Sequence, residues 1–348
     1  MNIEECLEKM KNNLSSEDLF KDAVYESKKV MDELNPYVTI MNDYDHVESD
    51  SLINGVPYAL KDNFSTKGIL TTGSSNILKD YIPPYDSTVY KKLKNAGAVL
   101  VGKTVLDELA MGGSGLTGHT GIVRNPWDTT RISGGSSAGS AVVVSRGIVP
   151  FSIGSDTGDS VRKPASYCGV VGFKPTYGRV SRYGLFPFAS SLDHVGIFAR
   201  NVKDVAIVTD ILKGKDKMDM TTLESDSVNY SENLSTDLTG KKFFYIKEIV
   251  DKSLYQNNIE TLDILDVFYK QIEDLKTRGA SVTEVSIDKT LLECIYPVYF
   301  IISCAESTSN NSNLTGFIFG NRMEGNTPEE IMMNTRTKGF AEMIKRRF

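Results

Sequence analysis

Residues 154–165, GSDTGDSVRKPA, decide what kind of fold and site this sequence encodes. They follow an apolar run, Val149 to Ile153, and open with glycine and small polar residues around Ser160. A strand that ends in a sharp glycine-containing turn with an exposed serine is how many hydrolases present a nucleophile. A serine hydroxyl attacks well only when a neighbouring base takes its proton. No histidine lies within thirty residues of Ser160, so another side chain must be the base.

Segments on both sides of this stretch predict alternating strands and helices. Strand-like runs lie at residues 56–60, 98–101, 242–246 and 281–287, and helical patterns lie at 19–34, 86–95, 201–212, 259–278 and from 327 onward. A run of small apolar residues, Ala141 to Val144, predicts a buried helix. Alternation of this kind is typical of an α/β fold, in which helices pack on a sheet.

Length and composition are those of an ordinary globular protein. The chain has 348 residues, of which 40% are hydrophobic and 24% are charged, enough for a large core. Its net charge of −6 provides no overall basic field that would attract nucleic acid or an anionic membrane. No run of about 18 apolar residues occurs, so we expect neither a membrane span nor a signal peptide. The four cysteines (Cys6, Cys168, Cys294 and Cys304) are scattered, which favours a reducing cytoplasm over a disulfide framework.

One short motif that suggests nucleotide binding is better explained as a strand. Residues 97–104, GAVLVGKT, match the pattern of a phosphate-binding loop, whose free backbone N–H groups point at phosphates. The middle residues here, Ala-Val-Leu-Val, are typical of a strand, and a helical pattern precedes the first glycine where a strand belongs. We therefore expect these N–H groups to bond within a sheet.

Metal and thiol chemistry find little support in the sequence. His46, His119 and His194 are isolated from one another and no cysteine pair has ligand spacing, so we expect no metal site. Asp193 and His194 are adjacent, but neighbours in sequence rarely face one another in a catalytic triad. Cys168 lies among apolar residues in SYCGVVG, which favours a buried structural cysteine over a nucleophile.

A lysine remains as the candidate base. The run Val56 to Leu60 would carry Lys61 off the end of an apolar strand into a partly buried position. Burial disfavours the ammonium, and a lysine base needs a pKa of roughly 7–8 instead of its ordinary ~10.4. The alternative is an ordinary solvated lysine at a strand end. A second segment, GGSSAGS at 134–140, is either a flexible loop or part of the site, and the apolar run after it disfavours a linker.

Taken together and in this order, Lys61 in ALKDN, GGSSAGS and GSDTGDS–RKPA closely resemble the amidase signature family. The flanking strings GVPYALKDN, AGAVLVGKTVLDELAMGGS, NPWD and GFKPTYGRVSRYGLFPFASSLDHVG agree, and the dense similarity covers about residues 54–214. The resemblance implies an α/β/α fold, with a large mixed β-sheet covered by helices on both faces, in a single domain over residues 1–348. Family members run further, so we expect the protein to continue beyond Phe348.

The resemblance also implies an answer to the question of the base. In this family a lysine is the base, and a serine in a cis peptide bond relays the proton to and from the nucleophilic serine. Carried over by motif, these residues are Lys61, Ser136 and Ser160. The oxyanion would be held by backbone N–H groups of the following turn residues: Thr157, Gly158 and Asp159.

Within the family the sequence is most similar to the glutamine-hydrolysing A subunits of tRNA-dependent amidotransferases, through DELAMGGS, GFKPTYGRVSRYGL, KDKMDMTT and AESTSN. This similarity implies hydrolysis of glutamine, whose ammonia converts Glu-tRNA(Gln) to Gln-tRNA(Gln). A B subunit would bind the tRNA and use ATP and magnesium, and a small C subunit would contact both the A and B subunits. The present chain would hold no cofactor. An arginine of the KRR segment, Arg346 or Arg347, is expected to bind the α-carboxylate of glutamine.

Asp159 departs from the family, in which this position is usually glycine. Its carboxylate would repel the oxyanion if it pointed inward, and Arg162 and Lys163 follow closely enough to neutralise it. The alternative is that Asp159 points away and bonds locally, as short polar side chains in turns commonly do. Two other functions therefore remain open: a free-standing amidase acting on another amide, and a catalytically impaired scaffold subunit.

Overall fold

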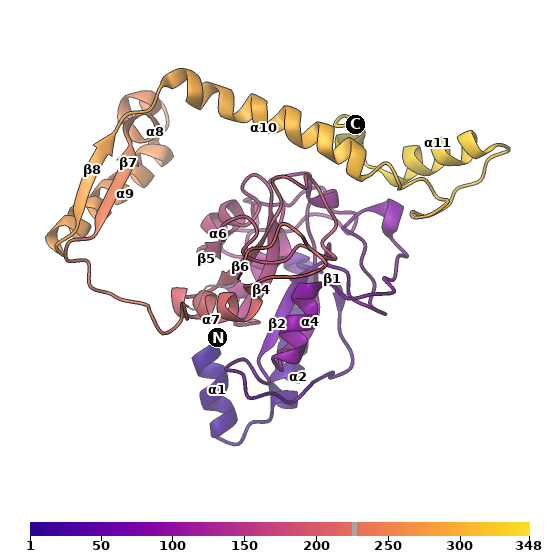
Figure 1. The fold of residues 1–348 in the computed structure, drawn as a ribbon, viewed down its shortest axis with the longest axis horizontal. Coiled ribbons are helices and arrows are strands. Elements are labelled where there is room, and N and C mark those ends of the chain that lie inside the picture. Colours follow the sequence, from indigo (N-terminus) through magenta and orange to yellow (C-terminus); the bar gives the residue numbers. More distant parts are fainter. Residues whose placement is uncertain (225–227) are drawn as a thin grey trace. The chain divides into compact units, whose positions relative to one another are not determined.

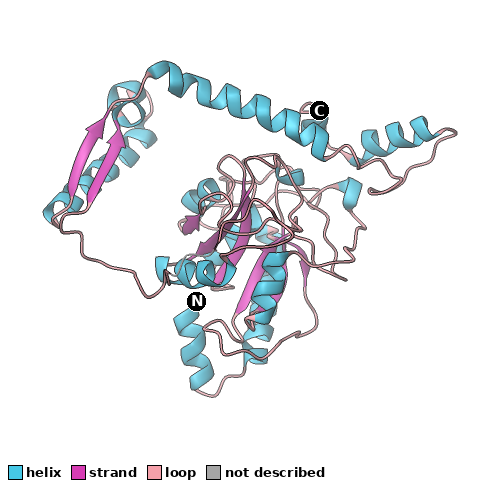
Figure 2. Cartoon of the chain, viewed as in Figure 1, coloured by secondary structure: helices cyan, strands magenta, loops and turns pink. Residues whose placement is uncertain are grey.

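The computed structural model describes residues 1–224 and 228–348, which fall into two compact units. One unit comprises Met1–Glu232 and Ile302–Phe348, and the other comprises Asn233–Ile301. Figure 1 labels most of the helices and strands, and Figure 2 colours the same chain by secondary structure. The single-domain organisation expected over residues 1–348 stays a prediction.

The first unit is built on a six-stranded mixed sheet with the strand order β1-β3-β2-β4-β6-β5. The strands are β1 (Tyr37–Ile40), β2 (Pro57–Lys61), β3 (Val99–Thr104), β4 (Phe151–Asp156), β5 (Val171–Phe173) and β6 (His194–Ala199). Strands β3, β2 and β4 run parallel, whereas β1 pairs antiparallel with β3, and β6 pairs antiparallel with both β4 and β5. The large mixed sheet predicted from the sequence is thus confirmed.

Helices cover both faces of this sheet, which confirms the α/β/α arrangement. The helices that flank it are α1 (Ile3–Lys11), α2 (Ser16–Lys29), α4 (Thr88–Asn95), α5 (Ala138–Ser145), α6 (Arg162–Cys168) and α7 (Val202–Leu212). Because alternate side chains of a strand point to opposite faces, Tyr58 and Leu60 pack in an apolar cluster with α1, α4 and α7. Ala59 packs in a second cluster with α5 and α6.

Most of the predicted elements are present, and several others, including α1 and α6, were not predicted. The strand over the phosphate-loop match is confirmed as β3, preceded by α4 as expected. Strands β1, β5 and β6 were not predicted, nor was helix α10 (Lys289–Asn310), which contains Pro297. The remaining short elements of this unit are α3 (Met31–Leu34), the 3-10 helices η1 (Asn76–Leu78) and η2 (Glu108–Ala110), α11 (Pro328–Gly339) and α12 (Glu342–Lys345).

The second unit contains a small β-α-β motif. Strands β7 (Lys242–Ile246) and β8 (Ser281–Val285) pair in parallel, and α9 (Ile259–Thr277) connects them through α8 (Lys247–Val250) and the 3-10 helix η3 (Lys252–Tyr255). All three main elements match the predicted strands and helix. Nowhere in the described residues does a helix combine the length and the apolar character needed to cross a membrane.

Candidate active site

The three sequence motifs meet at one edge of the sheet in the first unit. Strands β2 and β4 are parallel neighbours, so their carboxyl ends, at Lys61 and Asp156, lie at the same edge. Clefts at the carboxyl ends of strands are where open α/β sheets commonly bind ligands. The GGSSAGS segment forms the turn that leads into α5, and the GSDTGDS segment forms the turn between β4 and α6.

Lys61 is fully buried, and its ammonium position is surrounded by serine oxygens. Lys61 Nζ lies 2.8 Å from Ser136 Oγ, 2.9 Å from Ser155 Oγ and 3.2 Å from the carbonyl oxygen of Ser155. The contact with Ser136 joins two residues that are 75 positions apart in the sequence. The predicted proximity of the lysine and the relay serine is therefore present in the structure.

Burial changes the acid–base behaviour of this lysine. Desolvation lowers the pKa of Lys61 to about 7, although the carboxylates of Asp107, Asp156 and Asp193 act in the opposite direction. A lysine with a pKa near 7 carries a substantial neutral fraction at neutral pH, and only the neutral amine can accept a proton. The environment thus gives Lys61 the property that a base needs here.

Ser136 is held in place by a residue that sequence reasoning missed. The Gly135–Ser136 peptide bond is cis, as the resemblance implies. The backbone N–H of Asp107 donates to the carbonyl oxygen of Ser136 at 3.0 Å. The Asp107 carboxylate in turn accepts hydrogen bonds from the N–H groups of Ser114, Gly115, Leu116 and Thr117. Asp107 belongs to the string DELAMGGS, and nothing local in that string marks it as an anchor.

Ser160 lies in a turn that is fixed at both ends. Ser160 is 4% exposed, and its carbonyl oxygen accepts the N–H of Ser137 at 3.1 Å, which brings the turn of the candidate nucleophile beside the cis-serine segment. The buried carboxylate of Asp156 accepts the N–H of Val161 at 2.9 Å and pairs with the Arg162 guanidinium at 3.1 Å. The turn around Ser160 is consequently rigid on the side of α6.

The predicted oxyanion donors lie in the same turn. Among the described residues, the N–H groups of Gly158, Asp159 and Ser160 have no hydrogen-bond acceptor. Thr157 Oγ1 donates to Asp193 Oδ1 at 2.6 Å, and the Asp193 carboxylate also accepts backbone N–H groups from the preceding loop. Burial raises the pKa of Asp193 to about 6. Asp193 is therefore no triad member, and it instead anchors the turn whose N–H groups are free to hold an oxyanion.

Asp159 bonds locally. It does not adopt a positive φ, so the position does not require glycine's conformational freedom. Its carboxylate forms an ion pair with Lys163, one helical turn further on, at 2.6 Å. Arg162 pairs with Asp156 instead. The geometry favours the local-bonding interpretation over an inward-pointing carboxylate.

We therefore expect Asp159→Gly to change kcat for amide hydrolysis by less than tenfold, or less than about 1.4 kcal/mol in the barrier. The reason is that the charge removed is already neutralised by Lys163. Ammonia release under saturating substrate measures the effect, with Lys163→Ala as the companion variant. A gain of about a hundredfold or more in Asp159→Gly would instead mean that Asp159 restrains the site.

The two candidate carboxylate-binding arginines differ in their surroundings. The Arg346 side chain is 77% exposed and lies 3.4 Å from Glu342 on its own helix. The Arg347 guanidinium lies over the ring of Phe188, 5.7 Å from the ring centre. Phe188 belongs to the loop that Asp193 anchors. Arg347 thus lies against this loop, while the role of either arginine stays a prediction.

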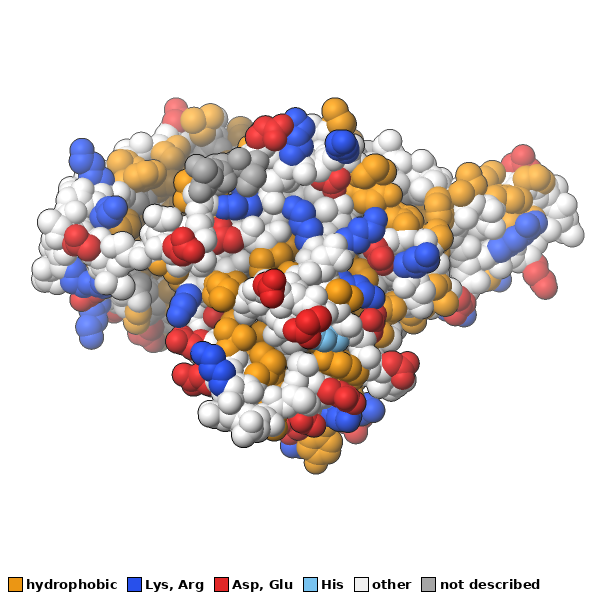
Figure 3. Space-filling model, turned by 60° about the horizontal axis from the view of Figure 1, so that its bottom comes forward, with side chains coloured by type: hydrophobic (Ala, Val, Ile, Leu, Met, Phe, Trp, Pro, Cys, Tyr) orange, Lys and Arg blue, Asp and Glu red, His pale blue; other side chains and the backbone are white. Residues whose placement is uncertain are grey.

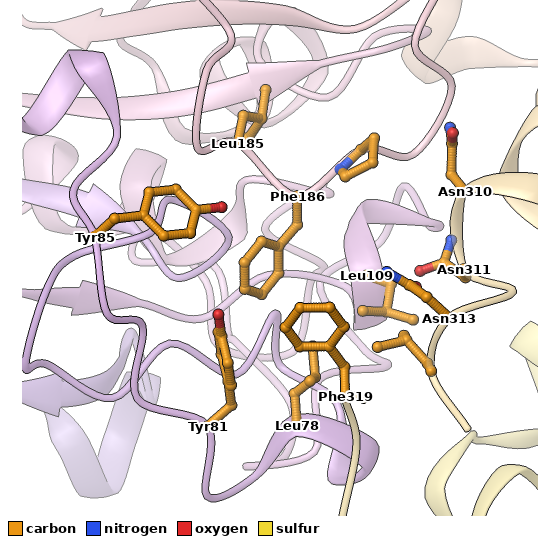
Figure 4. A pocket seen from close by; sticks show the side chains of 12 residues that line it. Leu78, Tyr81, Tyr85, Leu109, Leu185, Phe186, Asn310, Asn311, Asn313 and Phe319 are labelled. Carbon is orange, nitrogen blue, oxygen red and sulfur yellow. The ribbon is translucent and has the colours of Figure 1, made fainter. Parts of the chain in front are cut away.

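A pocket of about 180 Å³ opens beside these residues within the first unit. Its lining is mostly aromatic and aliphatic, with three asparagines: Leu78, Tyr81, Tyr85, Leu109, Leu185, Phe186, Pro187, Asn310, Asn311, Asn313, Leu314 and Phe319. Figure 4 shows the rings of Tyr81, Phe186 and Phe319 gathered at its centre. Hydrogen bonds link the wall of this pocket to the serines around Lys61. The N–H of Phe186 donates to the carbonyl oxygen of Asn63, and the side-chain amide of Asn63 donates to Ser155 Oγ.

The structure gives the disfavoured cysteine and histidine structural surroundings, although His194 is the strand partner of Asp156. Cys168 is fully buried, and burial raises the pKa of its thiol to about 12, which suits a structural role. His194 begins β6 and bonds the carbonyl oxygen of Leu192 through Nδ1. In the part of the chain that the structure describes, no cluster of His, Cys, Asp and Glu side chains is suited to a metal ion.

Comparison with known proteins gives a consistent result. Residues 38–348 match the family model described as Amidase. The chain is 47% identical over 310 residues to the A subunit of glutamyl-tRNA(Gln) amidotransferase of Mycoplasma pneumoniae, an alignment that covers 86% of this chain and 63% of that protein. The chain thus spans just under two thirds of the length of this relative.

Two solved structures extend the comparison to the fold. The crystal structure of the glutamyl-tRNA(Gln) amidotransferase A subunit from Thermotoga maritima superposes with a TM-score of 0.79 at 38% identity, covering 97% of this chain and 71% of the other. An amidase family protein from Bacillus anthracis superposes with a TM-score of 0.78 at 27% identity, covering 100% of this chain and 72% of the other.

Proposed function

The chain belongs to the amidase family, and we propose that it is the glutamine-hydrolysing component of a tRNA-dependent amidotransferase. The observation that carries this proposal is the 2.8 Å contact between Lys61 Nζ and Ser136 Oγ, beside the turn that presents Ser160. The similarity to amidotransferase A subunits from Mycoplasma and Thermotoga supports the choice of glutamine as substrate.

The reaction follows from these positions. Ser160 Oγ attacks the carbon of the side-chain amide, and its proton passes through the Ser136 hydroxyl to the neutral amine of Lys61. The negative charge on the amide oxygen is stabilised by backbone N–H groups of the 157–160 turn. The C–N bond then breaks, the proton returns along the same relay to the leaving nitrogen, and ammonia departs. Water attacks the acyl ester next and releases glutamate and free Ser160.

The proposal includes partners for the ammonia. A B subunit would activate the glutamate of mischarged Glu-tRNA(Gln) with ATP and magnesium, and a C subunit would hold the other two together as a heterotrimer. A net charge of −6 supports the assignment of tRNA binding to the B subunit. On the face shown in Figure 3, acidic and basic side chains are interspersed. The four scattered cysteines, all unpaired, support a cytoplasmic location.

A free-standing amidase is the second candidate, because the fold and the lysine–serine cluster are equally suited to other amides. The similarity to the amidase family protein from Bacillus anthracis supports this alternative. Measuring ammonia released from glutamine, with and without B and C subunits, and from a panel of other primary amides, separates the two. Glutamine as the preferred substrate, enhanced by the partners, supports the amidotransferase. Preference for another amide without partners supports the second candidate.

We expect ammonium chloride to bypass the serine chemistry in the assembled enzyme. Ser160→Ala should abolish glutamine-dependent formation of Gln-tRNA(Gln) and leave ammonium-dependent formation near the wild-type rate, because only the ammonia supply is lost. The measurement is the conversion of Glu-tRNA(Gln) with either nitrogen donor. If both donors failed equally in a variant that still assembles, Ser160 would have a role other than ammonia generation.

A further inference from the structure

One buried carboxylate ties the end of the chain to the loop that follows β3. Glu108 is 2% exposed, and both of its carboxylate oxygens lie near the backbone N–H of Ala341, at 3.1 and 3.3 Å. Ser75 Oγ donates to Glu108 Oε1 at 2.5 Å. Ala341 immediately precedes α12, so Glu108 binds the start of this helix from a position 233 residues away.

The same contact places α12 beside the apolar cluster that borders the pocket. Ile344 of α12 is 1% exposed and shares an apolar cluster with Leu109 and Phe188. Leu109 lines the pocket, and Phe188 lies under the guanidinium of Arg347. The helix is therefore held at its first turn by Glu108 and on its inner side by Ile344.

A helix as short as α12 has little stability of its own, since isolated helices shorter than ~12–15 residues are marginal in water. Its orientation must come from its anchors. Burial raises the pKa of Glu108 to about 7, and a buried acceptor loses more than an exposed one when its hydrogen-bond partner is removed. Glu108 is thus the polar anchor of α12, and its neighbour Asp107 holds the relay serine Ser136.

We propose that Glu108 is a positioning residue for the substrate's α-carboxylate: by binding the N–H of Ala341 it sets the position of Arg346 and Arg347 at the end of α12. The inference rests on the proposed function and deepens it. Two consecutive acidic residues then support two parts of the site. Asp107 positions the relay serine Ser136, and Glu108 positions the end of α12, which carries the two arginines. The substrate class that this arrangement selects is a primary amide that also carries a carboxylate.

Two variants weaken or remove the Glu108–Ala341 bond from opposite sides. Glu108→Gln keeps the size of the side chain but leaves one oxygen to accept from both Ser75 and Ala341, in place of two. Ala341→Pro removes only the donor N–H, and the backbone already suits it, because Ala341 has φ −71° and Phe340 has φ −94° and ψ 139°. Asp204→Asn is the matched control, since Asp204 is another buried carboxylate that binds the start of a distant helix, through the N–H of Ile3 at 3.1 Å.

The test compares glutamine with butyramide, a primary amide without a carboxylate, in the same enzyme preparation. We expect Glu108→Gln and Ala341→Pro to raise KM for glutamine about tenfold, with kcat for both amides within about threefold of wild type. Asp204→Asn should leave both KM values unchanged. Equal losses for both amides, or an unchanged KM for glutamine in both variants, would overturn the proposal.

A second measurement separates this inference from the proposed function. Hydrogen exchange at the amides of Ile344 and Lys345, which donate to the carbonyl oxygen of Ala341, reports the position of α12 without any substrate. If wild type hydrolyses no glutamine but both variants exchange these amides faster, the proposed function fails and Glu108 still anchors α12. If the exchange rates of these amides are unchanged in both variants, Glu108 does not position α12, whatever the activity of the variants.

Discussion

Replacing Ser160 by alanine should eliminate glutamine hydrolysis, and replacing Ser136 or Lys61 by alanine should each reduce it by at least about a thousandfold. In the proposed relay the three side chains act as one unit, because the Ser160 proton passes through Ser136 to the buried amine of Lys61. Catalytic groups that act as a unit are strongly non-additive. The double variant Lys61→Ala/Ser136→Ala should therefore be hardly slower than either single variant.

Ammonia release from glutamine under single-turnover and steady-state conditions measures these losses. Ser145→Ala is a suitable control, because this serine lies on α5 and its hydroxyl bonds the carbonyl oxygen of Cys168 at 2.7 Å, away from the lysine. We expect this control to stay close to wild type. Near-normal turnover of Lys61→Ala at neutral pH would show that the lysine is not the base.

The pH dependence of kcat/KM should show a steep acidic limb. Lys61 has a pKa of about 7 in the folded protein, because burial disfavours its ammonium form. The neutral amine is the active base, so activity is retained above this pKa and falls as pH drops through it. Well below the pKa each unit of pH should cost roughly tenfold, and since half of the amine is already protonated at pH 7, activity should fall about fiftyfold between pH 7 and pH 5.

Lys61→Arg tests the assignment of this limb, since a guanidinium stays protonated at all accessible pH values and cannot act as a base. It should be inactive across the whole range. Circular dichroism at each pH excludes acid unfolding as the cause, and Asp193, with a pKa of about 6, adds its own effect only at the lower end. A wild-type profile that is flat from pH 8 to pH 5 is incompatible with a lysine base.

Local pattern was enough to predict much of the fold. The apolar runs at β2, β3, β7 and β8 and the periodicities of α4, α7 and α9 are present where the sequence places them. Such elements are encoded by neighbouring residues, through burial on one side and capping at the ends. β5 spans only three residues and α10 contains a proline, so neither carries a strong local pattern.

The sequence by itself determined which candidate groups the site contains: a lysine at a strand end, a glycine-rich serine turn and a second serine after another strand, with no histidine within thirty residues of Ser160. Only the tertiary structure decided how these groups are supported. Asp193 holds Thr157 and Glu108 holds Ala341, the latter across 233 positions. Contacts of this kind depend on which strands pair and in what register, and each acidic residue looks like an ordinary polar side chain in its own segment. A side chain's type is local information, whereas its partner is set by the packing of the whole unit.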